Sequence, residues 1–282
     1  MKRAILAVTA VVTAMTATLL AADTKAPALT LVIMDPLALP LSCPCVKGYA
    51  QRDYEQLSRH MEQQIGRPVE IAFAESLTAA LKKKTNGKAD VVIGKHSVVL
   101  HDAKKADMKF SPVASLTGKD GKTTQTGLVV VLKDDPAKNI ADLKEYKILY
   151  GEVEAEEKHG AVMKMLKGNQ FVIAPKPETC AACDEGATKL IDLGPKAKTA
   201  CVISSYAKPL LEGCGTVPKG ALRVVAETEP VHFVVAFTND GLPKDVKDSV
   251  TKYLMSVKDN ADLLTAIESK NGFVKFEEPK KK

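Results

Sequence analysis

Two cysteines separated by a single proline mark the segment of this chain best suited to chemistry. Cys43 and Cys45 lie in a Pro-punctuated loop that follows the apolar run Leu29–Met34. Such a run predicts a buried strand, and loops at the carboxyl ends of strands in open α/β sheets commonly bind ligands. Neighbouring thiolates are ligands that soft metals prefer. The loop is therefore a candidate ligand site, with copper or zinc as candidate ions.

The other four cysteines allow several interpretations. Cys180 and Cys183 form a C-x-x-C pair, a spacing found in metal sites, redox pairs and local disulfides. Cys201 and Cys214 are expected to form a structural bridge over a short loop or to be buried thiols. An exported protein favours disulfides, but six cysteines allow fifteen pairings.

The first 22 residues predict a cleaved signal peptide. Lys2 and Arg3 precede the apolar stretch Ala4–Leu20, and Ala21-Ala22 provides the small residues that a signal peptidase requires. The alternative is an uncleaved membrane anchor, because the stretch approaches spanning length. No cysteine lies near the cleavage point, so we expect an exported protein that is not a lipoprotein.

Composition argues against several functional classes. The formal net charge is +6, but acidic and basic residues alternate along the chain and no basic stripe interleaved with aromatic residues occurs. Nucleic-acid binding is therefore not expected. The sequence also lacks a Ser-His-Asp order, a Gly-rich phosphate loop and a paired-carboxylate signature, so we predict that the protein is not an enzyme.

Alternating apolar runs and amphipathic stretches predict an α/β protein of two lobes. Residues 28–125 and 237–282 are expected to form lobe 1, and residues 126–236 are expected to form lobe 2. The expected strands are Leu29–Met34, Val69–Ala74, Asp90–Gly94, Phe110–Leu116, Thr126–Leu132, Tyr146–Tyr150, Phe171–Ala174, Thr199–Ser204 and Val231–Thr238. The expected helices are Arg52–Ile65, 76–84, Ser97–Ala106, a short one from Asn139 or Ile140, Glu154–Leu166, Glu185–Leu193, Pro243–Val257 and Asn260–Ile267.

Four segments together resemble the periplasmic phosphate/phosphonate-type substrate-binding proteins of ABC importers, across nearly the whole chain after the signal peptide. They are FAESLTAALKKKTNGKADVVIGKHS (73–97), IADLKEYKILYGEVEAEEKHG (140–160), CVISSYAKPLL (201–211) and LRVVAETEPVHFVVAFTNDGLPKDVKDSVTKYLMSV (222–257). The resemblance implies a type II periplasmic-binding-protein fold, a two-lobed clamp in which each lobe is a mixed sheet flanked by helices and crossover strands join the lobes. It further implies a monomer in the periplasm that captures a small ligand in the interlobe cleft and delivers it to an ABC permease of the inner membrane.

The resemblance also indicates an altered ligand site. The family places Ser-Thr-Ser-Gly at a helix start, where hydroxyls and helix amides surround an anion. Here Glu157, Lys158 and His159 occupy the three hydroxyl positions, and a ligand-contacting His of the family aligns with Cys183. Carboxylates at a helix N-terminus satisfy the dipole themselves and repel a phosphonate. We expect the ligand to contact Lys95, His96, Glu157, Lys158, His159, Cys183, Ser204 and Ser205.

Two alternatives to solute binding follow from the same cleft. A periplasmic metal-handling protein could reuse the clamp, because a metal bridging both lobes would couple binding to closure. Its copper or zinc ligands would be Cys43, Cys45, His96, His159, Cys180 and Cys183. The cysteines could instead be disulfides, either Cys180–Cys183 or Cys43–Cys183 across the cleft. The second alternative is a thiol–disulfide protein that uses Cys180 and Cys183.

Overall fold

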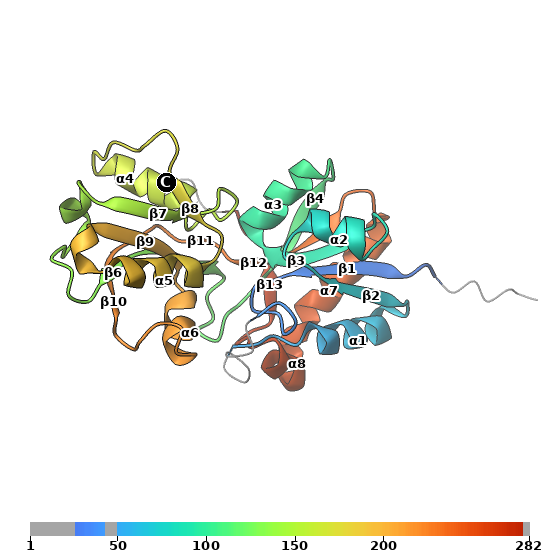
Figure 1. Cartoon of the computed structure of the whole chain (residues 1–282). Coiled ribbons are helices and arrows are strands. Elements are labelled where there is room, and N and C mark those ends of the chain that lie inside the picture. Colours follow the sequence, from blue (N-terminus) through green and yellow to red (C-terminus); the bar gives the residue numbers. More distant parts are fainter. Residues whose placement is uncertain (1–25, 43–49, 279–282) are drawn as a thin grey trace, which may run out of the picture.

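The apolar runs assemble into two separate sheets, each in its own lobe (Figure 1). The computed structural model describes residues 26–42 and 50–278. The predicted signal peptide (1–22) and the pair Cys43 and Cys45 lie outside the described residues.

Lobe 1 contains a six-stranded mixed sheet in the order β13-β4-β12-β3-β1-β2. In this sheet β1 pairs in parallel with β2 and β3, whereas β12 runs antiparallel to both β3 and β4. Its strands are β1 (Leu29–Met34), β2 (Val69–Phe73), β3 (Val91–Lys95), β4 (Phe110–Leu116), β12 (Val234–Asn239) and β13 (Phe273–Lys275). Its helices are α1 (Tyr54–Ile65), α2 (Leu77–Lys83), α3 (His96–Lys105), α7 (Lys244–Ser256) and α8 (Ala261–Ala266), with the 3-10 turn η4 (Val257–Asp259).

Strand periodicity divides the core of lobe 1 into two layers. Successive side chains of a strand point to opposite faces of the sheet. Leu31 and Ile33 of β1 therefore pack with α1, α7 and α8, whereas Val32 and Met34 pack with α2 and α3. Both faces of the sheet are covered, which explains why β1 is apolar except at the buried Thr30.

Lobe 2 contains a five-stranded mixed sheet in the order β10-β6-β9-β7-β8. Helix α4 covers one face with Val162 and Leu166, and helices α5 and α6 cover the other. The strands are β6 (Gly127–Leu132), β7 (Lys147–Gly151), β8 (Glu178–Cys180), β9 (Thr199–Ser204) and β10 (Leu222–Glu227). The helices are α4 (Gly160–Gly168), α5 (Cys183–Leu193) and α6 (Ala207–Gly213), with the 3-10 turns η2 (Ile140–Leu143) and η3 (Pro195–Ala197).

Two short strands join the lobes. β5 (Thr124–Gln125) and β11 (Val231–His232) pair with each other in an antiparallel ladder that is separate from both large sheets. The chain enters lobe 2 immediately after β5 and returns to lobe 1 immediately after β11. The predicted architecture of two mixed α/β lobes joined by crossover strands is thus confirmed (Figure 1).

Three predicted elements were wrong in detail. The helix expected from Glu154 begins only at Gly160, because residues 152–158 form turns that are held by tertiary contacts described below. The strand expected at Phe171–Ala174 has no ladder partner, since β8 occupies the edge of β7 instead. The single strand expected at Val231–Thr238 is divided at Phe233, because its two parts pair in different sheets.

A buried network anchors the chain at the carboxyl end of β1. Asp35 follows β1 directly, and its carboxylate accepts hydrogen bonds from the guanidinium of Arg52 at 2.7 Å and from the hydroxyl of Tyr54 at 2.5 Å. All three side chains are buried. The backbone of Arg52 also pairs with Leu37 and Leu39, so this network joins the segment after β1 to the segment before α1.

Among the residues that the structure describes, no helix has the length and apolar character needed to cross a bilayer.

Removing the carboxylate of this network should strongly destabilise lobe 1. Asp35→Ala leaves the Arg52 charge buried without its counter-ion, a change that costs about 3–5 kcal/mol. Asp248→Ala removes an exposed partner of Lys244 and should change the free energy of unfolding by less than about 0.5 kcal/mol. Urea denaturation of both variants measures the difference, and equal small losses would contradict the assigned role of Asp35.

Candidate ligand-binding site

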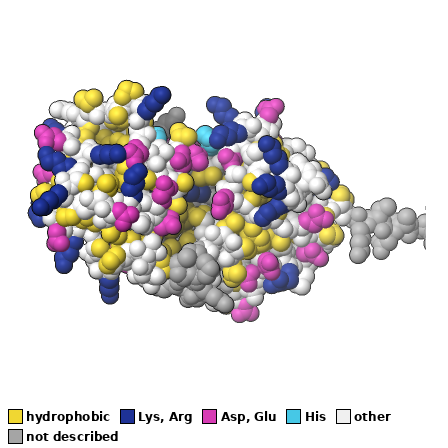
Figure 2. All heavy atoms as spheres, in the orientation of Figure 1, with side chains coloured by type: hydrophobic (Ala, Val, Ile, Leu, Met, Phe, Trp, Pro, Cys, Tyr) yellow, Lys and Arg dark blue, Asp and Glu magenta, His cyan; other side chains and the backbone are white. Residues whose placement is uncertain are grey.

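The surface is hollowed between the two lobes, and acidic side chains gather along the edges of the hollow (Figure 2). A buried ion pair spans this cleft. Lys95, the last residue of β3 in lobe 1, pairs with the carboxylate of Glu157, which lies in the loop between β7 and α4 of lobe 2. Lys95 is 7% exposed and Glu157 is fully buried. A charged contact between the lobes is therefore shielded from water.

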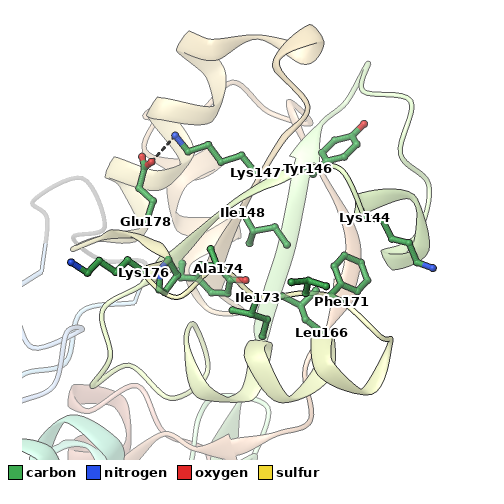
Figure 3. Close-up of a pocket in the computed structure, with 13 residues that line it drawn as sticks. Lys144, Tyr146, Lys147, Ile148, Leu166, Phe171, Ile173, Ala174, Lys176 and Glu178 are labelled. Atoms are coloured by element: carbon green, nitrogen blue, oxygen red, sulfur yellow. Dashed lines mark ion pairs between the residues drawn. The ribbon is translucent and has the colours of Figure 1, made fainter.

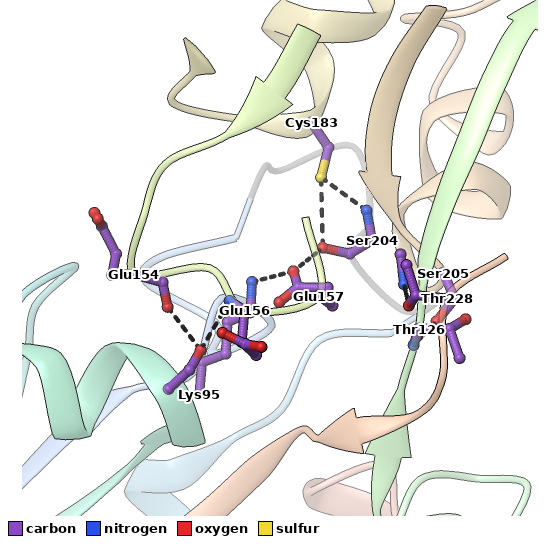
Figure 4. Close-up of polar contacts among 11 residues, drawn as sticks. Lys95, Thr126, Glu154, Glu156, Glu157, Cys183, Ser204, Ser205 and Thr228 are labelled. Atoms are coloured by element: carbon purple, nitrogen blue, oxygen red, sulfur yellow. Dashed lines mark hydrogen bonds and ion pairs between the residues drawn. The ribbon is translucent and has the colours of Figure 1, made fainter. Parts of the chain in front are cut away.

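The polar chain continues from Glu157 into lobe 2 (Figure 4). Ser204, the last residue of β9, donates its hydroxyl hydrogen bond to Glu157 Oε1 at 2.6 Å. The backbone N–H of Ser204 donates to Cys183 Sγ at 3.4 Å, and the Cys183 thiol lies 3.7 Å from Ser204 Oγ. Cys183 is the first residue of α5. Lys95, Glu157, Ser204 and Cys183 thus form one contiguous line across the cleft.

A glycine makes room for this arrangement. Gly127 opens β6 and lies directly opposite Ser204 in the ladder between β6 and β9. A Cβ atom added at Gly127 would overlap the backbone carbonyl of Glu157. The absence of a side chain at this position lets the Glu157 backbone approach the sheet, which brings its carboxylate beside Ser204.

The loop that carries Glu157 also contacts lobe 1 through its backbone. Ser97, in the first turn of α3, donates its hydroxyl to the carbonyl of Glu154 at 2.7 Å and accepts the N–H of Glu156 at 3.2 Å. A helix that began at Glu154 would need the Glu154 carbonyl for its own first hydrogen bond, whereas the first-turn N–H of Glu156 would lack a partner within the helix. The contacts to Ser97 explain why α4 begins later than its sequence pattern suggests.

The N-terminus of α4 is occupied by a carboxylate of the chain itself. The Glu156 carboxylate packs directly against Gly160, where any side chain would overlap its oxygens. Carboxylates are stabilised at helix N-termini by the helix dipole. Burial and the neighbouring Glu157 nevertheless raise the pKa of Glu156 above its ordinary value. The Glu156 carboxylate thus lies at the first residue of α4.

Aromatic residues form a second contact between the lobes. Phe233, at the break between β11 and β12, stacks on Tyr206 of lobe 2 with ring centroids 5.0 Å apart. The guanidinium of Arg52 lies over the same Phe233 ring at 5.5 Å. Burial raises the pKa of Tyr206 well above its ordinary value. The nearby Cys183, Glu157 and Asp35 raise this pKa further. Tyr206 therefore lies between the Asp35 network and the Glu157 line.

Three predicted contact residues have structural partners in lobe 2. Lys158 is buried with its side chain packed over Gly151. The Nδ1 atom of His159 lies 2.8 Å from the Gly151 carbonyl, and its ring contacts Tyr150. Ser205 accepts the N–H of Thr126 at 3.1 Å and so fastens β9 to the crossover segment.

His96 takes part in an aromatic cluster. Its ring lies 5.0 Å from that of His232 and stacks on Phe237 and Phe276 at 5.7 and 5.6 Å. Burial, with a smaller effect of His232, lowers the pKa of His96 to about 4. Burial also lowers the pKa of His232, although Glu278 opposes the shift. Both imidazoles are therefore neutral at pH 7.

The described cysteines do not form disulfides with one another. Cys180, Cys183, Cys201 and Cys214 are free thiols. Burial raises the pKa of Cys180, and Glu185 adds to the shift, so the reactive thiolate that a thiol–disulfide protein needs is disfavoured. Within residues 26–42 and 50–278, no three His, Cys, Asp or Glu side chains gather as a metal site. A copper or zinc site that includes Cys43 and Cys45 stays a prediction.

The ligand contacts predicted from the sequence include Lys95, Glu157, Cys183 and Ser204. The structure places these four side chains together. Sequence reasoning missed Asp35, Arg52 and Phe233. An acidic residue directly after a buried strand was an available signal for Asp35. Arg52 and Phe233 carry no such local signal, because their contacts join segments far apart in the chain.

A separate cavity lies on the outer flank of lobe 2 (Figure 3). It encloses about 280 Å³ between β7, the end of α4 and the segment 171–178. Lys147 and Glu178 at its rim are paired with each other. None of the predicted site residues lines it, so it is distinct from the interlobe site.

Comparison with known proteins gives a family and a fold. Residues 48–282 match the family model described as ABC transporter, phosphonate, periplasmic substrate-binding protein. No curated protein sequence matches the chain.

Several solved structures share the two-lobed fold at low sequence identity. A binding-protein component of an ABC phosphonate transporter from Pseudomonas aeruginosa is 13% identical, with a TM-score of 0.65 over 89% of this chain and 82% of that chain. PhnD1 from Prochlorococcus marinus, in complex with methylphosphonate, is 13% identical, with a TM-score of 0.62 over 89% and 93%. A Xanthomonas citri protein bound to ATP is 15% identical, with a TM-score of 0.63 over 89% and 91%.

The buried ion pair should behave as one unit in a double-mutant cycle. Lys95→Met leaves the Glu157 carboxylate buried without its cation and should cost about 3–5 kcal/mol of unfolding free energy. Adding Glu157→Gln removes the stranded charge, so the double variant should be more stable than the sum of the two single losses by about 1–3 kcal/mol. The exposed pair Arg59–Glu55 is the matched control, with a coupling below about 0.5 kcal/mol. Additive losses at Lys95 and Glu157 would contradict the pairing.

The histidine cluster predicts a specific acid sensitivity. An imidazole in the unfolded chain titrates near pH 6.5, whereas the pKa of His96 is about 4 in the folded protein. Between these values the unfolded chain binds more protons, so stability is lost as the pH falls through this window. His96→Phe keeps the stacking on Phe237 and Phe276 and removes this loss.

Thermal unfolding from pH 7.5 to pH 4.5 measures the effect. The wild-type Tm should fall more steeply than that of His96→Phe. Parallel curves for the two proteins would show that His96 does not titrate with the expected low pKa.

Proposed function

Because the chain belongs to the family of periplasmic substrate-binding proteins of phosphonate ABC transporters, we propose that it holds a small solute between its two lobes and presents it to the transporter. Proteins of this family bind and deliver and are not enzymes. The line of Lys95, Glu157, Ser204 and Cys183 carries the proposal, because it is a buried polar site to which both lobes contribute.

Hinge closure is the proposed mechanism. The short ladder between β5 and β11 joins the lobes, and each lobe supplies one member of the ion pair between Lys95 and Glu157. A solute that contacts groups of both lobes binds the closed form better than the open form, and this difference in affinity shifts the population towards closure. The permease then recognises the closed form.

We further propose that the ligand site differs from one built for a bare phosphonate. The solved relative from Prochlorococcus marinus holds methylphosphonate. In this chain Glu156 packs against the first residue of α4, and Glu157 lies buried against Lys95 of the other lobe. Two carboxylates at this end of α4 repel an added dianion, most strongly where water is excluded. We therefore propose that this chain keeps the two-lobed fold of its family but has different polar side chains at the ligand site.

We also propose that the protein is exported to the periplasm by a cleaved signal peptide. The basic and apolar residues before Ala22 support export with cleavage of residues 1–22, and the absence of a cysteine near that point supports release without a lipid anchor. We propose that the protein acts as a monomer.

A thermal-shift panel tests solute binding. Anions, cations and zwitterions of small size are each added to the purified protein in large excess. A bound member should add about 2.7 kcal/mol of stability at a hundredfold excess over its Kd, and small-angle scattering should show a smaller radius of gyration. A panel that changes neither quantity would contradict the proposed function.

Replacing the Glu157 carboxylate by a hydroxyl should strengthen the binding of methylphosphonate. Glu157→Ser removes the repelling charge and should bind methylphosphonate at least about 10-fold more tightly than the wild type, because one charge contact in a buried site is worth more than about 1.4 kcal/mol. Glu55→Ser, on the exposed face of α1, is the control. Titration calorimetry that shows equal or weaker binding by Glu157→Ser would overturn the proposed role of Glu157.

A further inference from the structure

Lysines are concentrated in one segment of lobe 1. Residues 77–109, from the start of α2 to the start of β4, contain eight lysines and three aspartates, a formal net charge of +5 out of +6 for the whole chain. Lys95 belongs to the buried pair with Glu157, and Lys84 donates to the carbonyl of Phe73. The other six are exposed and are called the lysine patch: Lys82, Lys83, Lys88, Lys104, Lys105 and Lys109.

The fold brings the lysine patch to one side of lobe 1. Helices α2 and α3 cover the same face of the six-stranded sheet, and the carboxylate of Asp102 in α3 accepts the N–H of Leu77 at the start of α2 at 2.8 Å. Figure 2 shows basic side chains gathered over these two helices. Two exposed acids, Glu75 and Asp107, flank the lysines in the sequence, so the patch keeps a net positive charge.

An exposed leucine accompanies the lysines on α3. Leu100 is 41% exposed and precedes Lys104 by one helical turn, so the two side chains share a face of the helix. Apolar side chains beside lysines can enter the apolar boundary of a bilayer while the ammonium groups stay among the lipid headgroups. The surface of α3 therefore combines the two features that interfacial helices use.

The residue types favour a membrane over a protein or a nucleic acid as the partner. Residues 77–109 contain no Arg, Phe, Tyr or Trp. Protein interfaces are enriched in arginine and aromatic residues and depleted in lysine, and single-stranded nucleic acids are held by aromatic stacking. Lysine is a hydrated point charge without a fixed binding geometry. Clusters of about four to eight basic residues suit the diffuse negative surface of an anionic bilayer.

We propose that the lysine patch and Leu100 form a docking surface for a bilayer that contains anionic phospholipid. Lys88 precedes β3 and Lys95 ends it in the cleft, so the patch reaches the edge of the sheet opposite the cleft. Docking therefore leaves the cleft accessible and does not require a bound solute. It is reversible and weakened by salt, because exposed charges are screened within about 10 Å at 0.1 M ionic strength.

Vesicle sedimentation tests the docking surface with the purified protein. Vesicles of phosphatidylcholine are compared with vesicles in which about 30% of the lipid is phosphatidylglycerol, the anionic component. The wild type should bind the anionic vesicles at least about 100-fold more tightly, because each lysine near such a surface contributes roughly fivefold. Raising the salt concentration should release the protein. Equal binding to both kinds of vesicle, or to neither, would overturn the proposal.

Two sets of four substitutions separate the patch from net charge. The first set changes four patch lysines to Gln: Lys82, Lys83, Lys104 and Lys105. The second set makes the same change on the other face of the sheet, at Lys244, Lys247, Lys252 and Lys258 of α7 and η4. The first variant should bind anionic vesicles at least about 30-fold more weakly, and the second should lose less than about fivefold. Equal losses would show that overall charge and not the patch is responsible.

The leucine has its own control. Leu100→Ser should weaken vesicle binding by about 3- to 10-fold, because part of the apolar contact is lost. Leu193→Ser, at a 45% exposed leucine that ends α5 in lobe 2, should leave binding unchanged. Equal effects of the two variants would remove Leu100 from the docking surface.

An acidic polypeptide is the competing partner. Titration calorimetry with poly-glutamate measures its affinity for the wild type and for both lysine sets. If poly-glutamate binds through the patch and anionic vesicles do not, the surface recognises an acidic protein and the membrane proposal is wrong. Because the vesicle assay needs no solute, its failure leaves the proposed solute binding intact.

Discussion

A fully buried carboxylate at the boundary of two lobes imposes the strongest constraint on this molecule. Glu157 has no access to water, so its charge must be compensated by groups of the protein. Lys95 from lobe 1 and Ser204 from lobe 2 both donate to Oε1. Because these donors come from different lobes, the compensation of one charge also sets how the lobes meet.

Other local features serve this arrangement. Gly127 lacks the side chain that would exclude the Glu157 backbone, and Ser97 binds backbone groups on both sides of Ala155. The aromatic contact from Arg52 through Phe233 to Tyr206 provides a second connection close to the hinge. The cleft therefore combines a polar centre with an aromatic side wall.

Strands were predictable from sequence where burial on both faces produces long apolar runs. β1 and β9 have the predicted bounds and are buried at every residue, because helices cover both sides of each sheet. Prediction failed where tertiary contacts compete with local pattern. The helical pattern from Glu154 is overridden by the contacts to Ser97, and the apolar run at Phe171 has no free strand edge to join. Among site residues, those next to strand ends were predictable, whereas Arg52 and Phe233 depend on the three-dimensional packing of distant segments.

The central claim is that the pair of Lys95 and Glu157 forms the solute site, and native mass spectrometry of protein purified from the periplasm tests it most directly. The account predicts that the wild-type protein carries a small solute whose mass is lost on denaturation, and that the double variant Lys95→Met/Glu157→Gln carries none. Retention of the same solute by the double variant would contradict the account, because binding would then not depend on the buried pair.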